Sequence, residues 1–181
     1  MSRVVSHQRG FSLTELVMVV AMAGTLMAVA VPLSGNLMAS MKLNEASRLI
    51  ERELADARLR AVSTNRALRV RTNCPATGFV RTVEFTATAT DTAANRCLNG
   101  PYPFPPDDDL MTLPNYDGPV RRIPNGASVS TVTYHFQPDG TVFNVVNNVI
   151  TTMASEQTVT ISRGNMSRTV KVNSAGKIQI Q

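Results

Sequence analysis

Residues 16–41 form an uncharged, largely apolar run near the start of the sequence. A helix that spans a membrane needs about 20 such residues. Arg3 and Arg9 precede the run, and basic residues beside a span favour the cytoplasmic side. The pattern therefore predicts a single-pass helix with a cytoplasmic N-terminus and with the rest of the chain across the membrane.

Apolar residues then recur at steps of three and four positions, which is the spacing of one helix face. They are Leu43, Ala46, Ile50, Leu54, Ala57 and Ala61. Charged residues, among them Arg52 and Asp56, occupy another face of the same predicted helix. We predict one helix over residues 12–62, roughly 75 Å long at about 1.5 Å per residue, whose second half packs on a folded head.

After Asn65 the spacing of apolar residues changes to two, which is typical of strands with one buried face. The predicted strands cover residues 68–71, 79–89, 132–136, 142–146, 158–162, 168–172 and 177–180. Residues 98–119 hold six of the ten prolines, which predicts an irregular connection. The predicted fold class is therefore α+β, with one long N-terminal helix packed on an antiparallel β-rich head.

The overall composition is that of an ordered globular protein, because 43% of the 181 residues are hydrophobic and 17% are charged. The formal net charge is +5, and it falls to +3 if the first ten residues, with Arg3 and Arg9, are removed. This mild excess permits contact with anionic partners but does not require it.

Patterns for catalysis or metal binding are weak. His135 is the only histidine beyond the first ten residues, and its alternation with Tyr134 and Phe136 predicts that it faces solvent or borders the core. No Gly-rich phosphate loop and no clear Ser-His-Asp order is present. The three consecutive aspartates at 107–109 lack the alternating spacing of a calcium loop. We expect no enzyme, no cofactor and no metal site.

Cys74 and Cys97 are the only cysteines, and neither belongs to a Cys-x-x-Cys pair. On the oxidising side of a membrane they predict one disulfide, which would stabilise the fold by about 3 kcal/mol in the chain-entropy model. The alternative is a pair of free thiols.

Glu15 is the single acidic residue at the edge of the apolar run. A secretory signal peptide would have a shorter apolar core and no acid at its start. A carboxylate in this position either lies solvated among lipid headgroups or needs a cationic partner. Cleavage after Gly10 would create such a partner, the amine of Phe11, in the same chain or in an adjacent one. Between adjacent chains this pair would set the register of packed helices.

The stretch Gly10-Phe11-Ser12-Leu13-Thr14-Glu15-Leu16 resembles the class III signal of type IV pilins and pseudopilins. The resemblance implies that prepilin peptidase cleaves between Gly10 and Phe11 and N-methylates Phe11. It also implies that Glu15 guides the subunit into a filament by pairing with a neighbour's amine. The expected organisation is a leader at 1–10, a transmembrane and filament-core helix at 11–41, an amphipathic second half at 42–65, and a periplasmic β-rich head at 66–181.

Three further motifs resemble the GspH/FimT family of minor pseudopilins and minor pilins. They begin at Glu53, Phe136 and Gly176 and read Glu-Leu-Ala-Asp-Ala-Arg-Leu-Arg-Ala-Val, Phe-Gln-Pro-Asp-Gly and Gly-Lys-Ile. The resemblance implies a structural subunit that initiates or caps a type II secretion pseudopilus or a type IV pilus. Its partners would be other pilins or pseudopilins, and it would pass from the bacterial inner membrane into an extracytoplasmic filament.

Some members of that family are DNA receptors for natural transformation and use basic residues near the C-terminus. Carried over by position, Arg163, Arg168 and Lys171 would contact phosphates in a sequence-independent way. The alternative, which the mild net charge favours, is that they are ordinary surface cations. A third hypothesis is a membrane-anchored periplasmic protein whose helix is not processed.

Overall fold

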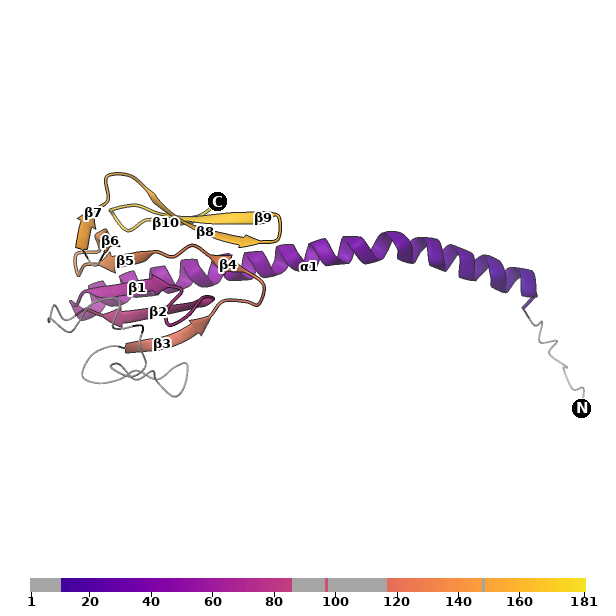
Figure 1. Cartoon of the computed structure of the whole chain (residues 1–181), viewed down its shortest axis with the longest axis horizontal. Helices are drawn as coiled ribbons and strands as arrows, with labels where there is room; N and C mark the ends of the chain where they lie inside the picture. The colour runs from indigo at the N-terminus through magenta and orange to yellow at the C-terminus, as the bar shows by residue number, and fades with distance from the viewer. Residues whose placement is uncertain (1–10, 86–96, 98–116, 148) are drawn as a thin grey trace, which may run out of the picture. The chain divides into compact units, whose positions relative to one another are not determined.

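The computed structural model describes residues 11–85, 97, 117–147 and 149–181, which form one helix and ten strands (Figure 1). The helix α1 (Leu13–Thr64) is close to the predicted range. The chain divides into two compact units, Met1–Met38 and Ala39–Gln181, and α1 passes through both. All the strands belong to the second unit.

Two antiparallel sheets make up the β-rich part of the second unit. The six-stranded sheet has the order β3-β2-β1-β5-β6-β7. Its strands are β1 (Leu68–Thr72), β2 (Phe79–Glu84), β3 (Asp117–Arg122), β5 (Thr133–Phe136), β6 (Val142–Val146) and β7 (Val149–Thr152). The four-stranded sheet has the order β10-β9-β8-β4. Its strands are β4 (Ser128–Val129), β8 (Gln157–Arg163), β9 (Met166–Val172) and β10 (Ile178–Ile180).

The second half of α1 forms the centre of the core. All six apolar residues that predicted its inner face, from Leu43 to Ala61, are at most 3% exposed. They belong to one hydrophobic cluster with residues of both sheets, including Phe136 of β5 and Val170 of β9. Full burial of each large apolar side chain contributes about 1.5–3 kcal/mol. The predicted fold class, a helix packed on an antiparallel β-rich head, is confirmed.

Three strands, β3, β4 and β7, were not among the predicted strands. β3 lies partly within residues 98–119, where the prolines predicted an irregular connection, so that prediction is wrong from Asp117 onward. Pro119 is tolerated because β3 is an edge strand that pairs only with β2 in the part of the chain that the structure describes. β7 was not predicted at all. β2 ends at Glu84, and the rest of its predicted range, from 86, lies outside the described residues.

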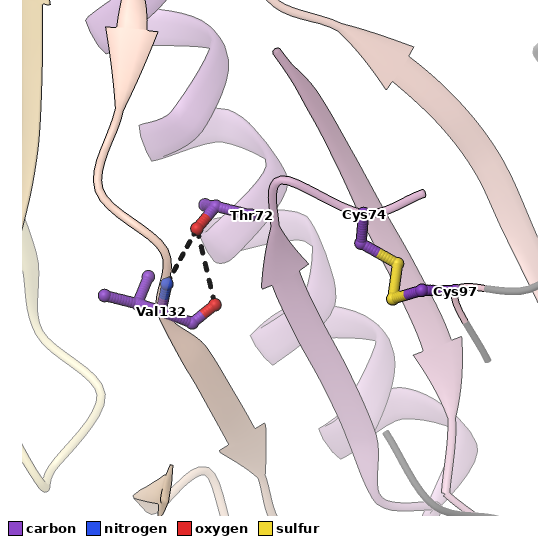
Figure 2. Close-up of a disulfide and its surroundings, with 4 residues drawn as sticks. All are labelled: Thr72, Cys74, Cys97 and Val132. Carbon is purple, nitrogen blue, oxygen red and sulfur yellow. Dashed lines mark hydrogen bonds between the residues drawn. A yellow bond between two sulfur atoms is a disulfide. The ribbon is translucent and has the colours of Figure 1, made fainter. Parts of the chain in front are cut away.

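The predicted disulfide between Cys74 and Cys97 is present, with the two Cα atoms 5.2 Å apart (Figure 2). Beside it, the Thr72 hydroxyl joins the end of β1 to the segment before β5. This hydroxyl accepts a hydrogen bond from the Val132 N–H at 2.8 Å and donates one to the Ser130 carbonyl oxygen at 2.7 Å. The end of β1 is therefore fixed both by a covalent bond and by a side chain.

Candidate functional site

Glu15 lies in the first turn of α1 and is the acidic residue of that turn. The Ser12 carbonyl oxygen accepts hydrogen bonds from the N–H groups of Glu15 and Leu16, both at 3.1 Å. Ser12 is therefore the N-cap, and its hydroxyl lies 2.8 Å from that of Thr14. Glu15 lies three residues after this N-cap, which is the sequence spacing of a capping box.

Glu15 is exposed to solvent, and none of the residues that the structure describes forms a salt bridge with it. The positive end of the helix dipole favours its negative charge in this position. Phe11 is 81% exposed, whereas Gly10 lies outside the described residues. Cleavage after Gly10 and pairing of Glu15 with an amine therefore stay predictions.

Apolar side chains are exposed on every side of the first half of α1. The exposed fractions run from 58% for Val17 to 72% for Leu26 between Leu16 and Met41, among the large hydrophobic residues whose side chains are described. A helix that is apolar all round requires lipid or other helices around it. Over the described part of the chain, no helix contains a stretch long and apolar enough to cross a membrane.

Arg58 joins the three motifs that resemble the GspH/FimT family. Its Nε donates to the Gly140 carbonyl oxygen and its Nη2 to the Ala175 carbonyl oxygen, both at 3.1 Å. Gly140 and Gly176 both have a positive φ, and a Cβ on Gly176 would meet the Arg58 side chain. The motifs that begin at Glu53, Phe136 and Gly176 therefore form one contact between the helix and two turns.

The residues predicted to contact DNA do not form one surface. Arg163 and Arg168 lie on the face of the four-stranded sheet that also carries the buried Ile161, which pairs with Arg168. A guanidinium nitrogen of Arg163 donates to the Asn125 carbonyl oxygen. Arg168 lines a groove of about 560 Å³ beside α1, together with Glu51.

Lys171 lies on the opposite face of the same sheet, because it alternates with the buried Val170 and Val172. Its Nζ is 3.9 Å from a carboxylate oxygen of Glu156. The three cations therefore occupy two faces of the sheet. A carboxylate lies near two of them, Glu51 of α1 in the groove with Arg168 and Glu156 beside Lys171.

His135 does not face solvent, in contrast to one of the two predicted alternatives. It is 1% exposed, and the Arg69 Nε donates to its Nδ1 at 3.4 Å. The rings of His135 and Phe85 meet edge to face at 5.0 Å, and the Arg69 guanidinium lies 3.9 Å from the centre of the Phe85 ring. This histidine is therefore part of the packing on one face of the six-stranded sheet.

The pKa values of Glu53, Tyr134 and Asp139 are shifted. Burial raises the pKa of Glu53, although the Arg121 guanidinium 3.5 Å away acts in the opposite direction. Burial also raises the pKa of Tyr134 to about 12. Hydrogen bonds from the Thr141 hydroxyl and N–H lower the pKa of Asp139. The three groups lie on different elements, so the shifts do not mark a common site.

No cluster of three or more histidine, cysteine, aspartate or glutamate side chains suited to a metal ion occurs among the described residues. The aspartates at 107–109 lie outside them.

The chain was compared with known families, curated proteins and solved structures. No family model and no curated protein matches it. The structure is similar to crystal structures of the type IV minor pilin FimU of Pseudomonas aeruginosa strain PAO1 in two crystal forms. The TM-scores are 0.48 and 0.45, the identity is 18% in both, and the matches cover 78% and 77% of this chain and 90% and 92% of those chains. It is also similar to the minor pseudopilin EpsH of the Vibrio cholerae type 2 secretion system, with a TM-score of 0.49, 10% identity and coverage of 77% of this chain and 96% of that one.

Proposed function

We propose that this protein is a minor pilin or minor pseudopilin, a structural subunit that joins other subunits in a type IV pilus or a type II secretion pseudopilus. The observation that carries the proposal is the start of α1. The carboxylate of Glu15, in its first turn, lies four residues after Phe11 of the Gly10-Phe11 junction, and apolar side chains are exposed on every side of the helix behind it. Large exposed apolar surfaces are rare in soluble monomeric proteins and mark sites of contact with a membrane or with another protein.

The proposed sequence of events begins with insertion of residues 16–41 in the inner membrane, with the basic leader in the cytoplasm. Prepilin peptidase then cleaves between Gly10 and Phe11. The new amine of Phe11 pairs with Glu15 of a neighbouring subunit, which fixes the axial register, and the apolar surfaces of neighbouring helices replace lipid around one another. The head of residues 66–181 stays outside the cytoplasm, where the disulfide is stable.

N-terminal sequencing and intact mass of the protein recovered from membranes of the native bacterium would test the processing step. The expected mature chain begins with N-methylated Phe11. A chain that still begins with Met1 would contradict the proposal and would favour an unprocessed anchor.

A second experiment separates processing from assembly. Glu15→Ala is expected to leave cleavage intact and to reduce recovery of the subunit in sheared filaments by about tenfold or more, because loss of a buried ion pair of this kind costs several kcal/mol. Glu45→Ala, at an exposed position of the same helix, is the matched control and is expected to assemble normally. Equal recovery of both variants would contradict the role of Glu15.

A further inference from the structure

A groove of about 480 Å³ lies at the end of the six-stranded sheet where β5 begins and β6 ends. The residues that line it include one cation, two hydroxyl groups and two apolar side chains, which are Arg71, Thr131, Thr133, Val145 and Val146. In the part of the chain that the structure describes, no acidic residue lines it. Apolar walls with a few polar groups are typical of a site that binds a small ligand group.

The guanidinium group of Arg71 has no anion beside it among the described residues. Its Nε atom is buried without a hydrogen-bond partner, and none of the salt bridges within the described ranges includes it. Arg81 of β2 lies directly opposite Arg71, and like charges in opposed positions destabilise a sheet. A buried polar atom without a partner indicates that a water molecule or an ion satisfies it. Because an anion would also offset the repulsion from Arg81, we infer that the partner of Arg71 is an anion.

Two threonines supply further hydrogen-bond donors for this anion. Thr133 of β5 lies directly opposite Arg71, so the two side chains share one face of the sheet. The Thr131 hydroxyl accepts a hydrogen bond from the Asn73 Nδ2 at 2.8 Å, which leaves its own hydrogen to be donated. A planar guanidinium group with hydroxyl donors beside it matches the two oxygens of a carboxylate.

We propose that this groove binds a carboxylate group carried on a short aliphatic stem. One guanidinium group neutralises one negative charge, whereas a phosphate monoester carries about 1.5 to 2 at pH 7. Arg81 is 1% exposed and does not line the groove, so it supplies no second contact. Val145 and Val146 would pack against the stem and remove apolar surface from water. A glutamate side chain of a partner protein and a free short-chain carboxylic acid both present this chemistry.

This site goes beyond the proposed function. It lies in the unit Ala39–Gln181 and uses neither Glu15 nor the amine of Phe11. A failure of cleavage or of filament assembly would leave carboxylate binding intact, and a failure to bind a carboxylate would leave the proposed function standing.

Nuclear magnetic resonance of the full-length chain in detergent micelles tests the site. Propionate, which matches the end of a glutamate side chain, should shift the Nε–H signal of Arg71 in a saturable way. Propionamide has nearly the same shape without the charge and should bind at least about tenfold more weakly, and inorganic phosphate should also bind more weakly. Equal binding of propionamide or of phosphate would overturn the proposal, as would the absence of a saturable shift.

A substitution of Arg71 tests the same site from the protein side. Arg71→Gln should weaken propionate binding by about tenfold or more, measured from the backbone amide signals of Thr133 and Val145. Arg122→Gln, at an exposed position of β3 in the same sheet, is the matched control and should bind propionate as the parent does. Equal binding by the two variants would overturn the proposal. The comparison of propionate with propionamide uses the parent alone, so it does not depend on the folding of a variant.

The capped tripeptide acetyl-Ala-Glu-Ala-amide distinguishes the two sources of the carboxylate. Tighter binding of the tripeptide than of propionate would assign the groove to a glutamate of a partner protein. Tighter binding of propionate would assign it to a free carboxylic acid. Both results support a carboxylate site, whereas binding of the tripeptide that is unchanged in Arg71→Gln would contradict it.

Discussion

The Nε atom of Arg58 donates to the carbonyl oxygen of Gly140 at 3.1 Å, across 82 residues of sequence. The same guanidinium also bonds the Ala175 carbonyl oxygen, so one helix residue fixes two turns. Arg58→Ala is expected to lower the free energy of unfolding by about 2 kcal/mol, because two hydrogen bonds to a charged group are lost. Arg58→Lys should recover little of it, since a lysine cannot reproduce the planar, two-sided geometry. Urea unfolding of the three proteins measures the effect.

Substitution of Gly176 tests the contact with Arg58 in a second way. Gly176 has a φ of 78°, and a Cβ there would run into the Arg58 side chain and lie 2.6 Å from the Gly140 carbonyl oxygen. Gly176→Ala should cost more than about 2 kcal/mol, from backbone strain together with overpacking. Gly164 also has a positive φ, of 56°, but has no atom within 4 Å of its Cβ position. Gly164→Ala should therefore show only the backbone cost of about 1 kcal/mol. Equal losses in the two variants would remove the steric part of the explanation.

The shifted pKa of Glu53 makes the stability of the unit Ala39–Gln181 depend on pH. Burial raises its folded-state pKa above 4.5, so its protonated form is favoured by folding. The stabilisation this provides is fully present below the unfolded pKa and is lost as the pH rises through the folded pKa. Glu53→Gln should therefore be at least as stable as the parent at pH 7 and should lose this relative advantage at pH 4. Thermal unfolding at the two pH values measures it, with Glu45→Gln as the exposed control on the same helix.

Removal of the disulfide should weaken the fold without changing its topology. Replacing both Cys74 and Cys97 by serine is expected to lower the free energy of unfolding by about 3 kcal/mol, since the unfolded chain regains the entropy of the open loop. The far-ultraviolet circular dichroism of the folded variant should match the parent, because the shared core does not include residue 97. An unchanged unfolding midpoint in urea would contradict this expectation.

DNA binding through Arg163, Arg168 and Lys171 is expected to be weak. Phosphate contacts need accessible cations on one surface, whereas these three lie on two faces, and Lys171 is 3.9 Å from Glu156. Gel shifts with duplex DNA at low salt should change less than about twofold when all three become glutamine. A shift that is strong in the parent and absent in the triple variant would instead support a role in DNA uptake.

Local periodicity of apolar residues predicted α1 and most of the strands, and the structure contains these elements at the predicted positions. The six apolar residues from Leu43 to Ala61 are buried as their spacing indicated. β3 was missed because Gly118 and Pro119 are strand breakers in isolation, and only its position at a sheet edge makes them acceptable. β7 was missed because its sequence, Val-Ile-Thr-Thr, does not alternate between apolar and polar residues.

The features of the candidate site also form two groups: those that a local sequence pattern indicates and those that depend on the fold. The junction at Gly10 and the carboxylate of Glu15 are local features, so the sequence alone could indicate them. The contacts of Arg58 with Gly140 and Ala175 join residues that are 82 and 117 positions apart in the sequence, which no local pattern specifies. The same holds for Arg163, Arg168 and Lys171, since proximity in sequence did not place them on one face of the sheet.

The position of α1 in the core determines which pieces of this chain can exist separately. A cut near Asn65, where the spacing of apolar residues changes, would remove Ile50, Leu54 and Ala57 from the hydrophobic cluster that they share with both sheets. The strand residues of that cluster would lose the helix side chains against which they pack. A stable fragment of the head must therefore begin before Leu43, at about residue 39, where the second compact unit starts.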